Sequence, residues 1–397
     1  MKIIHVVDYL MPTMGYQEFL LPKWNARHGH EVHVITSDRY ANVPSYKKTF
    51  EPFLGPRLRD AGMELIDDVT VHRLPIRWEF QGRVWMAGFK KYLARLAPDV
   101  VFVHGTGCPA SFKAASWCQR SGVPLVMDNH MTFSSVREGL AAKLYYIALR
   151  ILTRTYLLPA THQFLGVAQE CSDFLHEKQN IPRNKIELLP LGIDTDLLTP
   201  NVTAPQEFRR NLGLSKDSII VMQTGKITPD KGAHLLAQAM APLMADEPNL
   251  HLILVGAGPD DYRQQVLAPL TENKVLDNFH ILPFVTTAEL ANYFSAADIC
   301  VFAKAASLSC LEAAACGTPV LMTDMPIGKW RAEMGAGETF RDGDVNDLRS
   351  KIGGLLNSAD DRRALGQAAR TSVQEHFSYD SVALQSEKIL TEAINSI

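Results

Sequence analysis

Short apolar runs and longer amphipathic segments alternate along almost the whole chain. The runs have the length and composition of buried strands, and the segments between them repeat apolar positions at helical spacing. The predicted strands cover residues 2–7, 31–36, 69–74, 99–103, 124–128, 163–167, 218–224, 250–255, 278–282, 299–302 and 318–322. Alternation of this kind is typical of doubly wound α/β domains with parallel sheets.

Helices are predicted between these strands, and one long segment fits neither pattern. The predicted helices include 17–28, 82–96, 110–121, 138–158, 168–178, 232–244, 261–270 and 288–295. Residues 38–60 are polar, aromatic and interrupted by proline, without a clear period. A connection of that length in a compact domain is usually functional, so we expect a binding loop there.

The length of the chain predicts two domains. A chain of 397 residues exceeds the size at which one hydrophobic core usually keeps growing. The stretch LPLGIDTDLLTP, residues 189–200, is marked by glycine and proline as a crossing between domains. We therefore expect one domain over 1–193 and a second over 194–377. The helix at 378–397 has a weak apolar stripe and no strand after it, so we expect it to pack back on the first domain.

Composition excludes several classes of function. A net charge of −3, without a basic stripe, gives no reason to expect nucleic acid as a partner. The six cysteines form no CxxC pair and predict reduced core thiols of a cytoplasmic protein. A strand begins almost at Met1, which predicts no signal peptide, and no apolar run reaches the roughly twenty residues of a spanning helix.

Two predicted helices suggest contact with a membrane surface. Residues 138–158 and 83–95 combine Lys and Arg with tyrosine and leucine, and faces of that kind can rest on anionic lipid. The alternative is a pair of ordinary amphipathic helices packed on a sheet. Peripheral contact at the inner face of the cell membrane is therefore a hypothesis that flotation with liposomes tests.

The stretch 298–324 places strand, loop, helix and strand in succession. Backbone N–H groups at the carboxyl end of a strand, with a helix dipole behind them, favour an anion. Glu312 is the acid nearest this loop, one turn inside the helix. A carboxylate beside an anion site is better suited to the hydroxyls of a ribose than to phosphate. The stretch predicts a site for a nucleotide.

Five segments, in this order and spacing, resemble the retaining glycosyltransferases of the GT-B fold, family 4, also called glycosyl transferases group 1. These segments are LPLGIDTDLLTP, GKITPDKG, LVGAGP, LPFVTTAELANYFSAADICV and LEAAACGTPVL. The opening segment, DYLMPTMGYQEFLLPKWNARHGHEVHVITS, is similar to the family's first loop and helix. The resemblance implies two Rossmann-like doubly wound domains facing a central cleft, and a nucleoside diphosphate sugar, UDP- or GDP-linked, as donor.

In the second domain the resemblance implies residues for each part of the donor. Lys226 and Lys231 of GKITPDKG match two basic positions on the donor diphosphate, and solvated loop lysines are the alternative. Lys226 stands where the family commonly has arginine, which keeps the charge but loses the bidentate fork. Glu312 matches the ribose-binding acid. Further donor contacts are implied at the backbone of Ser307 and Leu308, and at the base by Phe284 and Val285.

In the first domain the resemblance implies two positions. Gly15 matches a glycine that approaches the diphosphate closely, although an ordinary turn glycine would look the same. His130, in VMDNHMTF, matches the histidine beside the transferred sugar. A single histidine at a strand end is more often structural, and the family match reverses that preference. His104-Gly105-Thr106, at an equivalent strand end, suits the wall of a cleft.

Lys304 departs from the family pattern. Counting back from Glu312, the first acid of the Glu-x7-Glu signature should stand at this position, and the chain has Lys-Ala-Ala-Ser instead. An ammonium in a sugar pocket is costly to desolvate unless it meets an anion. Three partners are open: the donor diphosphate, an acid of the first domain, and a carboxylate on the sugar. The hypothesis to test is the third, a donor such as a uronic acid whose carboxylate Lys304 reads. A relative that no longer catalyses transfer is a further alternative.

These residues lead to a predicted reaction, with alternatives. We expect retaining transfer from a nucleoside diphosphate sugar to an unidentified acceptor, in glycan, glycolipid or natural-product glycoside synthesis. The sequence shows no second carboxylate for a covalent intermediate, which favours same-face attack. It also shows no Asp-x-Asp site, so we expect no metal and no resident cofactor. A GT-B epimerase or phosphorylase and a non-catalytic sugar-nucleotide-binding subunit stay open as alternatives.

Overall fold

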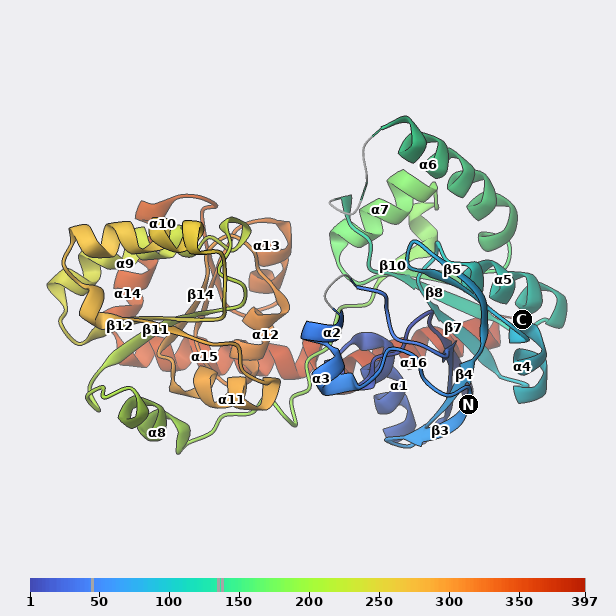
Figure 1. The fold of residues 1–397 in the computed structure, drawn as a ribbon, viewed down its shortest axis with the longest axis horizontal. Helices are drawn as coiled ribbons and strands as arrows, with labels where there is room; N and C mark the ends of the chain where they lie inside the picture. Colours follow the sequence, from blue (N-terminus) through green and yellow to red (C-terminus); the bar gives the residue numbers. More distant parts are fainter. Residues whose placement is uncertain (44–45, 134–135, 137–138, 397) are drawn as a thin grey trace. The chain divides into compact units, whose positions relative to one another are not determined.

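The computed structural model describes residues 1–43, 46–133, 136 and 139–396, and it forms two compact units (Figure 1). The first unit comprises residues 1–192 and 379–397, and the second comprises 193–378. Each unit contains one large, mostly parallel sheet, as the alternating pattern predicts. Among the described residues no helix is long and apolar enough to cross a membrane.

The sheet of the first unit has the strand order β10-β9-β8-β7-β1-β2-β4-β3. All neighbouring strands run parallel except β3, which pairs antiparallel with β4 at one edge. The strands are β1 Lys2–Val6, β2 Glu31–Ser37, β3 Gly62–Ile66, β4 Val69–Leu74, β7 Val100–His104, β8 Leu125–Asn129, β9 Gln163–Gly166 and β10 Ile186–Leu188. A separate hairpin joins β5 Ile76–Phe80 to β6 Arg83–Met86.

Helices cover both faces of this sheet. The helices of the first unit are α1 Gln17–Arg27, α2 Tyr46–Thr49, α3 Glu51–Leu54, α4 Phe89–Leu96, α5 Pro109–Ser121, α6 Leu140–Leu152, α7 Gln169–Gln179 and α16 Tyr379–Asn395, with a π-helical turn at Thr153–Leu157. Helices α1 and α16 share a core with Ile3, Phe102 and Val126 on one face. Helices α4 and α5 pack with the alternate residues, such as Ile4 and Val101, on the other.

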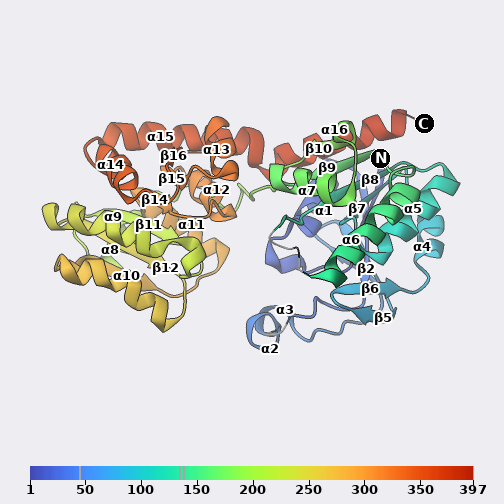
Figure 2. The ribbon, with the colours of Figure 1, turned by 90° about the horizontal axis from the view of Figure 1, so that it is seen from above.

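The last helix belongs to the first unit although it follows the second in sequence. Its apolar residues Val382, Ala383 and Leu390 are buried against the sheet and α1 (Figure 2). A Cβ on Gly192 would overlap the ring of Tyr379. The chain therefore leaves the first unit and returns to it at one place, where only glycine fits against the aromatic ring.

The sheet of the second unit is fully parallel, in the order β13-β12-β11-β14-β15-β16. Its strands are β11 Ile219–Thr224, β12 Leu250–Val255, β13 Phe279–Leu282, β14 Ile299–Phe302, β15 Val320–Thr323 and β16 Glu338–Phe340. Its helices are α8 Ala204–Asn211, α9 Ala233–Asp246, α10 Asp260–Glu272, α11 Thr287–Ala296, α12 Leu308–Ala315, α13 Pro326–Glu333, α14 Val345–Leu356 and α15 Ala359–Ser372. Figure 1 shows α9 and α10 on one side of this sheet and α11 on the other.

The structure corrects the helix predicted over 82–96. Residues Arg83–Met86 form strand β6, and only Phe89–Leu96 is helical. Gln81 and Gly82 both have positive φ, 47° and 73°, between the paired residues Phe80 and Arg83. Two such residues make a tight hairpin turn whose twist matches that of the strands. The basic helix proposed over 83–95 therefore begins only at Phe89, and Arg83 is not part of it.

Two other predicted segments differ in detail. The segment 38–60 contains the short helices α2 and α3, and residues 44 and 45 within it lie outside the described residues. The helix predicted from 138 begins at Leu140, with Glu138 likewise outside them. Strand β3 was not predicted, because its side chains are mostly exposed and its apolar pattern is weak.

Candidate functional site

Each sheet has one position at which the chain reverses its direction of winding. In the first unit, β1 lies between β2 and β7, and in the second, β11 lies between β12 and β14. Loops that leave the carboxyl ends of such strand pairs in opposite directions open a crevice, which is where doubly wound sheets bind ligands. The predicted site residues lie on or near these two switch points.

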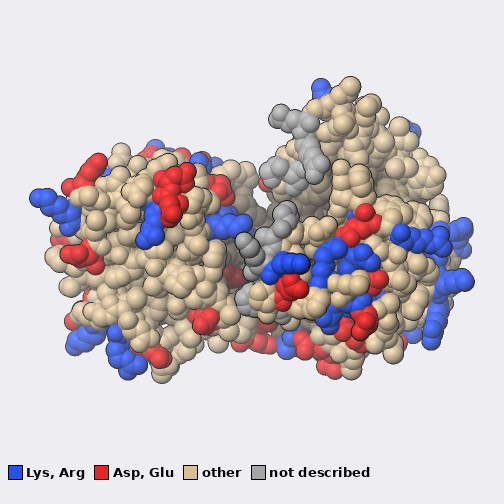
Figure 3. All heavy atoms as spheres, in the orientation of Figure 1, with Lys and Arg blue, Asp and Glu red and all other residues tan. Residues whose placement is uncertain are grey.

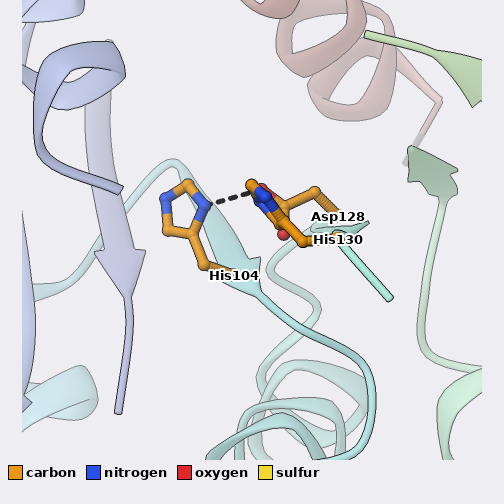
Figure 4. Close-up of side chains that lie close together, drawn as sticks. All are labelled: His104, Asp128 and His130. Atoms are coloured by element: carbon orange, nitrogen blue, oxygen red, sulfur yellow. Dashed lines mark hydrogen bonds and ion pairs between the residues drawn. The ribbon is translucent and has the colours of Figure 1, made fainter. Parts of the chain in front are cut away.

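Strand register builds the polar centre of the first unit. His104 ends β7 and pairs with Asp128 of β8, so both side chains lie on the same face of the sheet. His104 Nδ1 lies 2.6 Å from Asp128 Oδ2, and the Gly105 N–H donates to Asp128 Oδ1 at 3.0 Å. His130 Nε2, just after β8, lies 3.4 Å from Asp128 Oδ2 (Figure 4).

The two histidines keep Asp128 ionised although it is fully buried. Burial alone would raise its pKa, but the charges and hydrogen bonds of His104 and His130 hold it below the usual range. Burial would likewise lower the pKa of His130, and the Asp128 carboxylate instead raises it to about 9. His130 is therefore an imidazolium at neutral pH, with 32% of its side chain exposed.

These three side chains also meet the simplest requirement for a metal site. Among the described residues they alone gather three ligand-type atoms, all within 4.8 Å of one another. Two ligands of one tetrahedral zinc would stand roughly 3.3 Å apart, given zinc–ligand distances of about 2.0–2.1 Å. The 2.6 Å between His104 and Asp128 is therefore a hydrogen bond rather than the spacing of two metal ligands.

A buried chain of hydrogen bonds runs from this centre to helix α16. His104 Nε2 lies 3.2 Å from His5 Nδ1, and His5 Nε2 lies 3.2 Å from Asn25 Oδ1. Asn25 Nδ2 donates to Glu387 Oε1 at 2.8 Å. His28 approaches the same carboxylate oxygen at 2.8 Å. Residues of β7, β1, α1 and α16 are thus connected across the core.

The hydrogen-bond chain fixes where the protons lie. As a carboxylate, Glu387 only accepts, so Asn25 turns its NH₂ to Glu387 and its oxygen to His5. Burial and then His104 lower the pKa of His5, which is neutral and donates from Nε2. His5 Nδ1 must accept from His104 Nε2.

A cavity of about 250 Å³ opens beside this centre, at the switch point of the first unit. It is lined by the loop after β1, including Asp8 and Tyr9, and by His104 and Cys108. Burial raises the pKa of Asp8 to about 6, and its Oδ1 has no hydrogen-bond partner among the described residues. Asp8 was not predicted from the sequence, although it directly follows the first strand.

Gly15 lies in the same loop region but makes no close contact of its own. It has φ 71°, which a glycine adopts freely, and it ends the short 3₁₀ turn Pro12–Met14. A Cβ built at this position would meet nothing within 4 Å. The protein itself therefore leaves space beside Gly15, and the role implied for it stays a prediction.

Close backbone packing builds the switch point of the second unit. A Cβ on Gly256, after β12, would overlap the carbonyl oxygen of Gly225, after β11. A Cβ on Gly232 would lie 2.8 Å from the Cβ of Lys304, after β14. The loop 225–232, which carries Lys226 and Lys231, is therefore in direct contact with the loop that carries Lys304.

Three lysines on these loops are uncompensated. Lys226 and Lys304 are exposed and Lys231 is half-buried. Within the described part of the chain, none of the three has a carboxylate at ion-pair distance. Asp230 is the acid nearby: the hydrogen bond from Thr228 lowers its pKa most, and the charges of Lys231 and Lys226 lower it further. Figure 3 shows that charges of both signs are otherwise interspersed on the visible face of each unit.

Arg331 holds the 304–308 loop through hydrogen bonds to its backbone, and this role was not predicted from the sequence. Its buried guanidinium donates from Nη1 to the carbonyl oxygens of Ala306 at 2.9 Å and Ser307 at 2.7 Å. The Ser307 N–H donates to Ala305 O at 2.8 Å, within the loop. Ser307 stands at the N-cap position of α12, and Leu308 is the first helical residue. No sequence signal marks an arginine in the middle of α13 as part of this site.

The remaining predicted residues lie around the same loops. Glu312 is half-buried on α12, and burial raises its pKa although a hydrogen bond from Ser309 opposes this. Val285 packs against the core beside α11, whereas Phe284 is 59% exposed after β13. The structure thus brings Lys231, Lys304 and the start of α12 into one region, and His130 into the other unit's site.

Two Rossmann-like sheets, each with one switch point of the kind at which doubly wound sheets bind ligands, define a two-domain α/β protein. The sequence model of the family described as "Glycosyltransferase Family 4" matches residues 23–197. That of the family described as "Glycosyl transferases group 1" matches residues 205–372. The chain belongs to the GT-B glycosyltransferases of family 4, group 1.

Similar sequences carry a more specific name. The chain is 27% identical over 274 residues to the D-inositol 3-phosphate glycosyltransferase of Segniliparus rotundus, covering 66% of this chain and 60% of that one. It is 26% identical over 292 residues to the protein of the same name from Thermobispora bispora, covering 70% and 67%. The aligned regions therefore leave a third or more of each relative unmatched.

Solved structures share the fold at low sequence identity. A glycosyltransferase from Rickettsia africae superposes with a TM-score of 0.72 at 14% identity, covering 100% of this chain and 99% of that one. HepE from Anabaena, in complex with UDP, superposes with a TM-score of 0.71 at 17% identity, covering 99% and 100%. These likenesses show the GT-B fold.

Proposed function

We propose that the protein is a retaining glycosyltransferase that moves a sugar from a nucleoside diphosphate sugar, UDP- or GDP-linked, to an acceptor. The observation that carries the proposal is the set of uncompensated cations at the switch point of the second unit. Lys226, Lys231 and Lys304 stand on loops in direct contact, without carboxylate partners among the described residues. A diphosphate supplies the negative charge that these side chains lack.

In this proposal the second unit stabilises the leaving group. Charge builds on the departing diphosphate as the sugar–oxygen bond breaks, and prearranged cations and N–H donors lower the energy of that state. Lys226 and Lys231 take the part that a bound cation plays in other transferases, so we propose that no metal is required. Glu312 accepts hydrogen bonds from the ribose hydroxyls, and Phe284 and Val285 border the base.

The first unit supplies a proton donor in the proposal. His130 is an imidazolium at neutral pH, because Asp128 raises its pKa to about 9. It has one exposed edge and can donate a hydrogen bond to a hydroxyl of the transferred sugar. The departing diphosphate takes the acceptor proton in a same-face attack, which retains the configuration of the anomeric carbon and needs no covalent intermediate.

Names and bound molecules of similar proteins support this proposal. The relatives in Segniliparus and Thermobispora are both called D-inositol 3-phosphate glycosyltransferase. Structures of HepE contain UDP alone, UDP and glucose, or UDP-glucose. UDP-linked sugars are therefore the first donors to test, and GDP-linked sugars are tested beside them.

The test begins with a panel of UDP- and GDP-sugars, measured by thermal shift and by release of nucleoside diphosphate. Turnover that continues in EDTA, with a product whose anomeric configuration by NMR matches the donor, is the expected result. Tight donor binding without hydrolysis or transfer would instead indicate a non-catalytic subunit. Turnover that requires free phosphate would indicate a phosphorylase.

Lys304 adds a specificity to this proposal. Its side chain is exposed, lies against Gly232 and has no acid partner among the described residues. We propose that it reads a carboxylate on the donor sugar, as in a uronic acid. Lys304→Glu would place like charges together and should selectively abolish turnover of the acidic donor. A parent enzyme that uses neutral hexose donors and ignores acidic ones would exclude this role.

A further inference from the structure

A second and larger cavity, about 460 Å³, lies on the first unit between β6, α5, α6 and the π-helical turn. Its walls are mainly aromatic and aliphatic: Trp85, Phe112, Tyr145, Leu149, Leu152 and Tyr156. We call it the apolar pocket. Gly107 and Cys108, in the loop after β7, form one end of it. Cys108 also lines the smaller cavity beside Asp8 and His104, so the two cavities adjoin.

Three cations stand in the wall of the apolar pocket. Arg83 donates to the Gly107 carbonyl at 3.0 Å and to the Tyr145 hydroxyl at 2.7 Å. Lys90 donates to the Ser116 hydroxyl at 3.1 Å. Lys113 donates to the Met86 carbonyl at 2.8 Å, and its Nζ lies 3.9 Å above the ring of Trp85.

Asp8 attracts Arg83 and Lys113 but forms no ion pair with either of them. In the described part of the chain, none of Arg83, Lys90 and Lys113 makes an ion pair with a carboxylate. Burial, Arg77 and Lys90 lower the pKa of Lys113 to about 8, and the attraction of Asp8 only partly opposes them. Burial and Arg120 lower the pKa of Lys90. An anion in the pocket would relieve this mutual repulsion.

Apolar side chains continue outward from the pocket along α6. Leu144, Ile147 and Ile151 are 57%, 53% and 61% exposed, and Leu152 at the pocket wall is 40% exposed. Large contiguous apolar surface of this kind usually marks an interaction site. A polar ligand such as a nucleotide or a sugar phosphate would satisfy the cations but leave the aromatic walls uncovered.

We propose that the apolar pocket binds an amphiphile that carries an anionic group and a single apolar chain. The anionic group lies against Arg83, Lys90 and Lys113, and the chain lies between Phe112, Leu152 and Tyr156. Cys108 lines both this pocket and the cavity beside Asp8, so the two cavities adjoin. The polar end of the amphiphile therefore reaches toward the cavity beside Asp8. If the proposed transfer reaction holds, this ligand is the acceptor or the part of the acceptor that anchors it.

The test uses n-decyl phosphate below its micelle concentration, with decyl maltoside as the uncharged probe and n-hexyl phosphate as the short-chain probe. Binding is measured by calorimetry and followed by intrinsic tryptophan fluorescence, with Trp85→Phe identifying the part of the signal that comes from the pocket, without any nucleotide. We expect saturable one-to-one binding of decyl phosphate. Hexyl phosphate should bind at least about tenfold more weakly, because each buried methylene contributes, and decyl maltoside should also bind at least about tenfold more weakly.

Matched variants locate the bound amphiphile. Lys113→Gln and Leu152→Gln should each weaken decyl phosphate binding by about tenfold or more. Ile147→Gln, on the exposed α6 surface outside the pocket, should leave binding unchanged. Equal binding of the maltoside, or a loss in Ile147→Gln as large as in Leu152→Gln, would overturn the proposal. Binding that occurs only on vesicles of anionic lipid would assign the surface to a membrane instead.

The same measurements separate this proposal from the proposed function. Nucleoside diphosphate affinity is measured in the same variants and should be unchanged in Lys113→Gln and Leu152→Gln. Amphiphile binding without any sugar transfer would support the ligand proposed for the apolar pocket and contradict its role as an acceptor site. Sugar transfer without amphiphile binding would contradict the ligand proposed for the apolar pocket and leave the proposed transferase function standing.

Discussion

The two switch points of this protein have the same topology and opposite chemistry. In the first unit, His5, His104, Asp128 and Glu387 each lie at hydrogen-bond distance from another ionisable side chain, whereas Asp8 Oδ1 has no hydrogen-bond partner among the described residues. In the second unit, the loops after β11 and β14 are built from glycine and small residues, with lysines that lack acid partners among the described residues. The first arrangement holds protons at fixed atoms, and the second presents positive charge to a ligand.

In the transfer reaction that we propose, this difference gives the two units different tasks. The winding of a sheet determines where a crevice opens, but the residues at the strand ends determine what it does. The paired charges around His104 and Asp128 already have their partners within the first unit. The loop lysines of the second unit have no ion-pair partner among the described residues, and we propose that a diphosphate supplies one. Substitutions in the two units should therefore affect different quantities.

The largest effect is expected for Asp128→Asn. This change leaves His104 and His130 without their shared carboxylate, and removing one partner of a buried ion pair typically costs about 3–5 kcal/mol. Urea unfolding at neutral pH measures the loss. Asp246→Asn, on the exposed end of α9, is the control and should change stability by less than about 0.5 kcal/mol. A similar value for both variants would contradict the role of Asp128 as the centre of the first site.

The second effect concerns affinity rather than stability. Lys231→Ala and Lys226→Ala should each weaken nucleoside diphosphate binding by roughly tenfold to a hundredfold, since hydrogen bonds to charged groups contribute about 1.5–3 kcal/mol. Unfolding midpoints should barely move, because neither lysine forms an ion pair with a described residue and the nearby Asp230 is exposed. Lys216→Ala, exposed on the same unit, is the control. Unchanged affinity in both loop variants would show that the diphosphate lies elsewhere.

The third effect is a pH dependence of stability that arises from two groups of the first unit, His130 and Asp8. His130 has a folded pKa of about 9 against an ordinary 6.5, so its contribution to stability is complete below the lower value and disappears as pH rises through the higher one. Asp8, raised from 3.8 to about 6, acts in the same direction at lower pH. Both groups make the first unit less stable as pH rises.

The His130→Asn variant isolates the histidine. Its loss of stability relative to the parent should be larger near about pH 6 than near about pH 9.5, as measured by urea unfolding at both values. His376→Asn, with 41% of its side chain exposed, should show no such trend. A penalty that is equal at the two pH values would mean that Asp128 does not hold the proton on His130.

The smallest effect is expected at the far end of the hydrogen-bond chain. Glu387→Gln keeps an acceptor for Asn25 but removes the charge beside His28, whose pKa is raised by Asp380 and Glu387 against the effect of burial. The pKa of His28, followed by NMR, should fall toward its ordinary value. The cost in stability should be about 1 kcal/mol, typical of one hydrogen bond. An unchanged His28 titration would show that the chain ends before α16.

The sequence predicted the architecture well because it depends on local patterns. Strands such as 250–255 and 299–302 were located to within a residue, since buried parallel strands read as continuous apolar runs. The error at 82–96 had a local cause, because the Gln81-Gly82 turn was overlooked and the apolar residues were read as one helix. Lys226, Lys231 and Glu312 were found through family motifs, and their roles stay predictions.

Side-chain networks could not be predicted in the same way. Asn25 and Glu387 are 362 positions apart, and nothing in either segment indicates the other. His5 interrupts an apolar strand, and only its side-chain contact with His104, two residues beyond its register partner Phe102, connects it to the polar centre. Arg331 supports the 304–308 loop through backbone carbonyls, which leave no trace in residue identity. Such contacts depend on tertiary packing alone.

The contact between Gly192 and Tyr379 has a topological consequence. The second unit is an insertion within the first, and the two ends of the insertion meet, with Ile193 and Ser378 forming a β-bridge just beyond that contact. The first unit could be expressed with a short linker in place of residues 193–378, and the second unit could be expressed by itself. Each protein would contain a whole sheet with its own switch point. We therefore expect the two units to be separable on the chain, which crosses between them twice at one place.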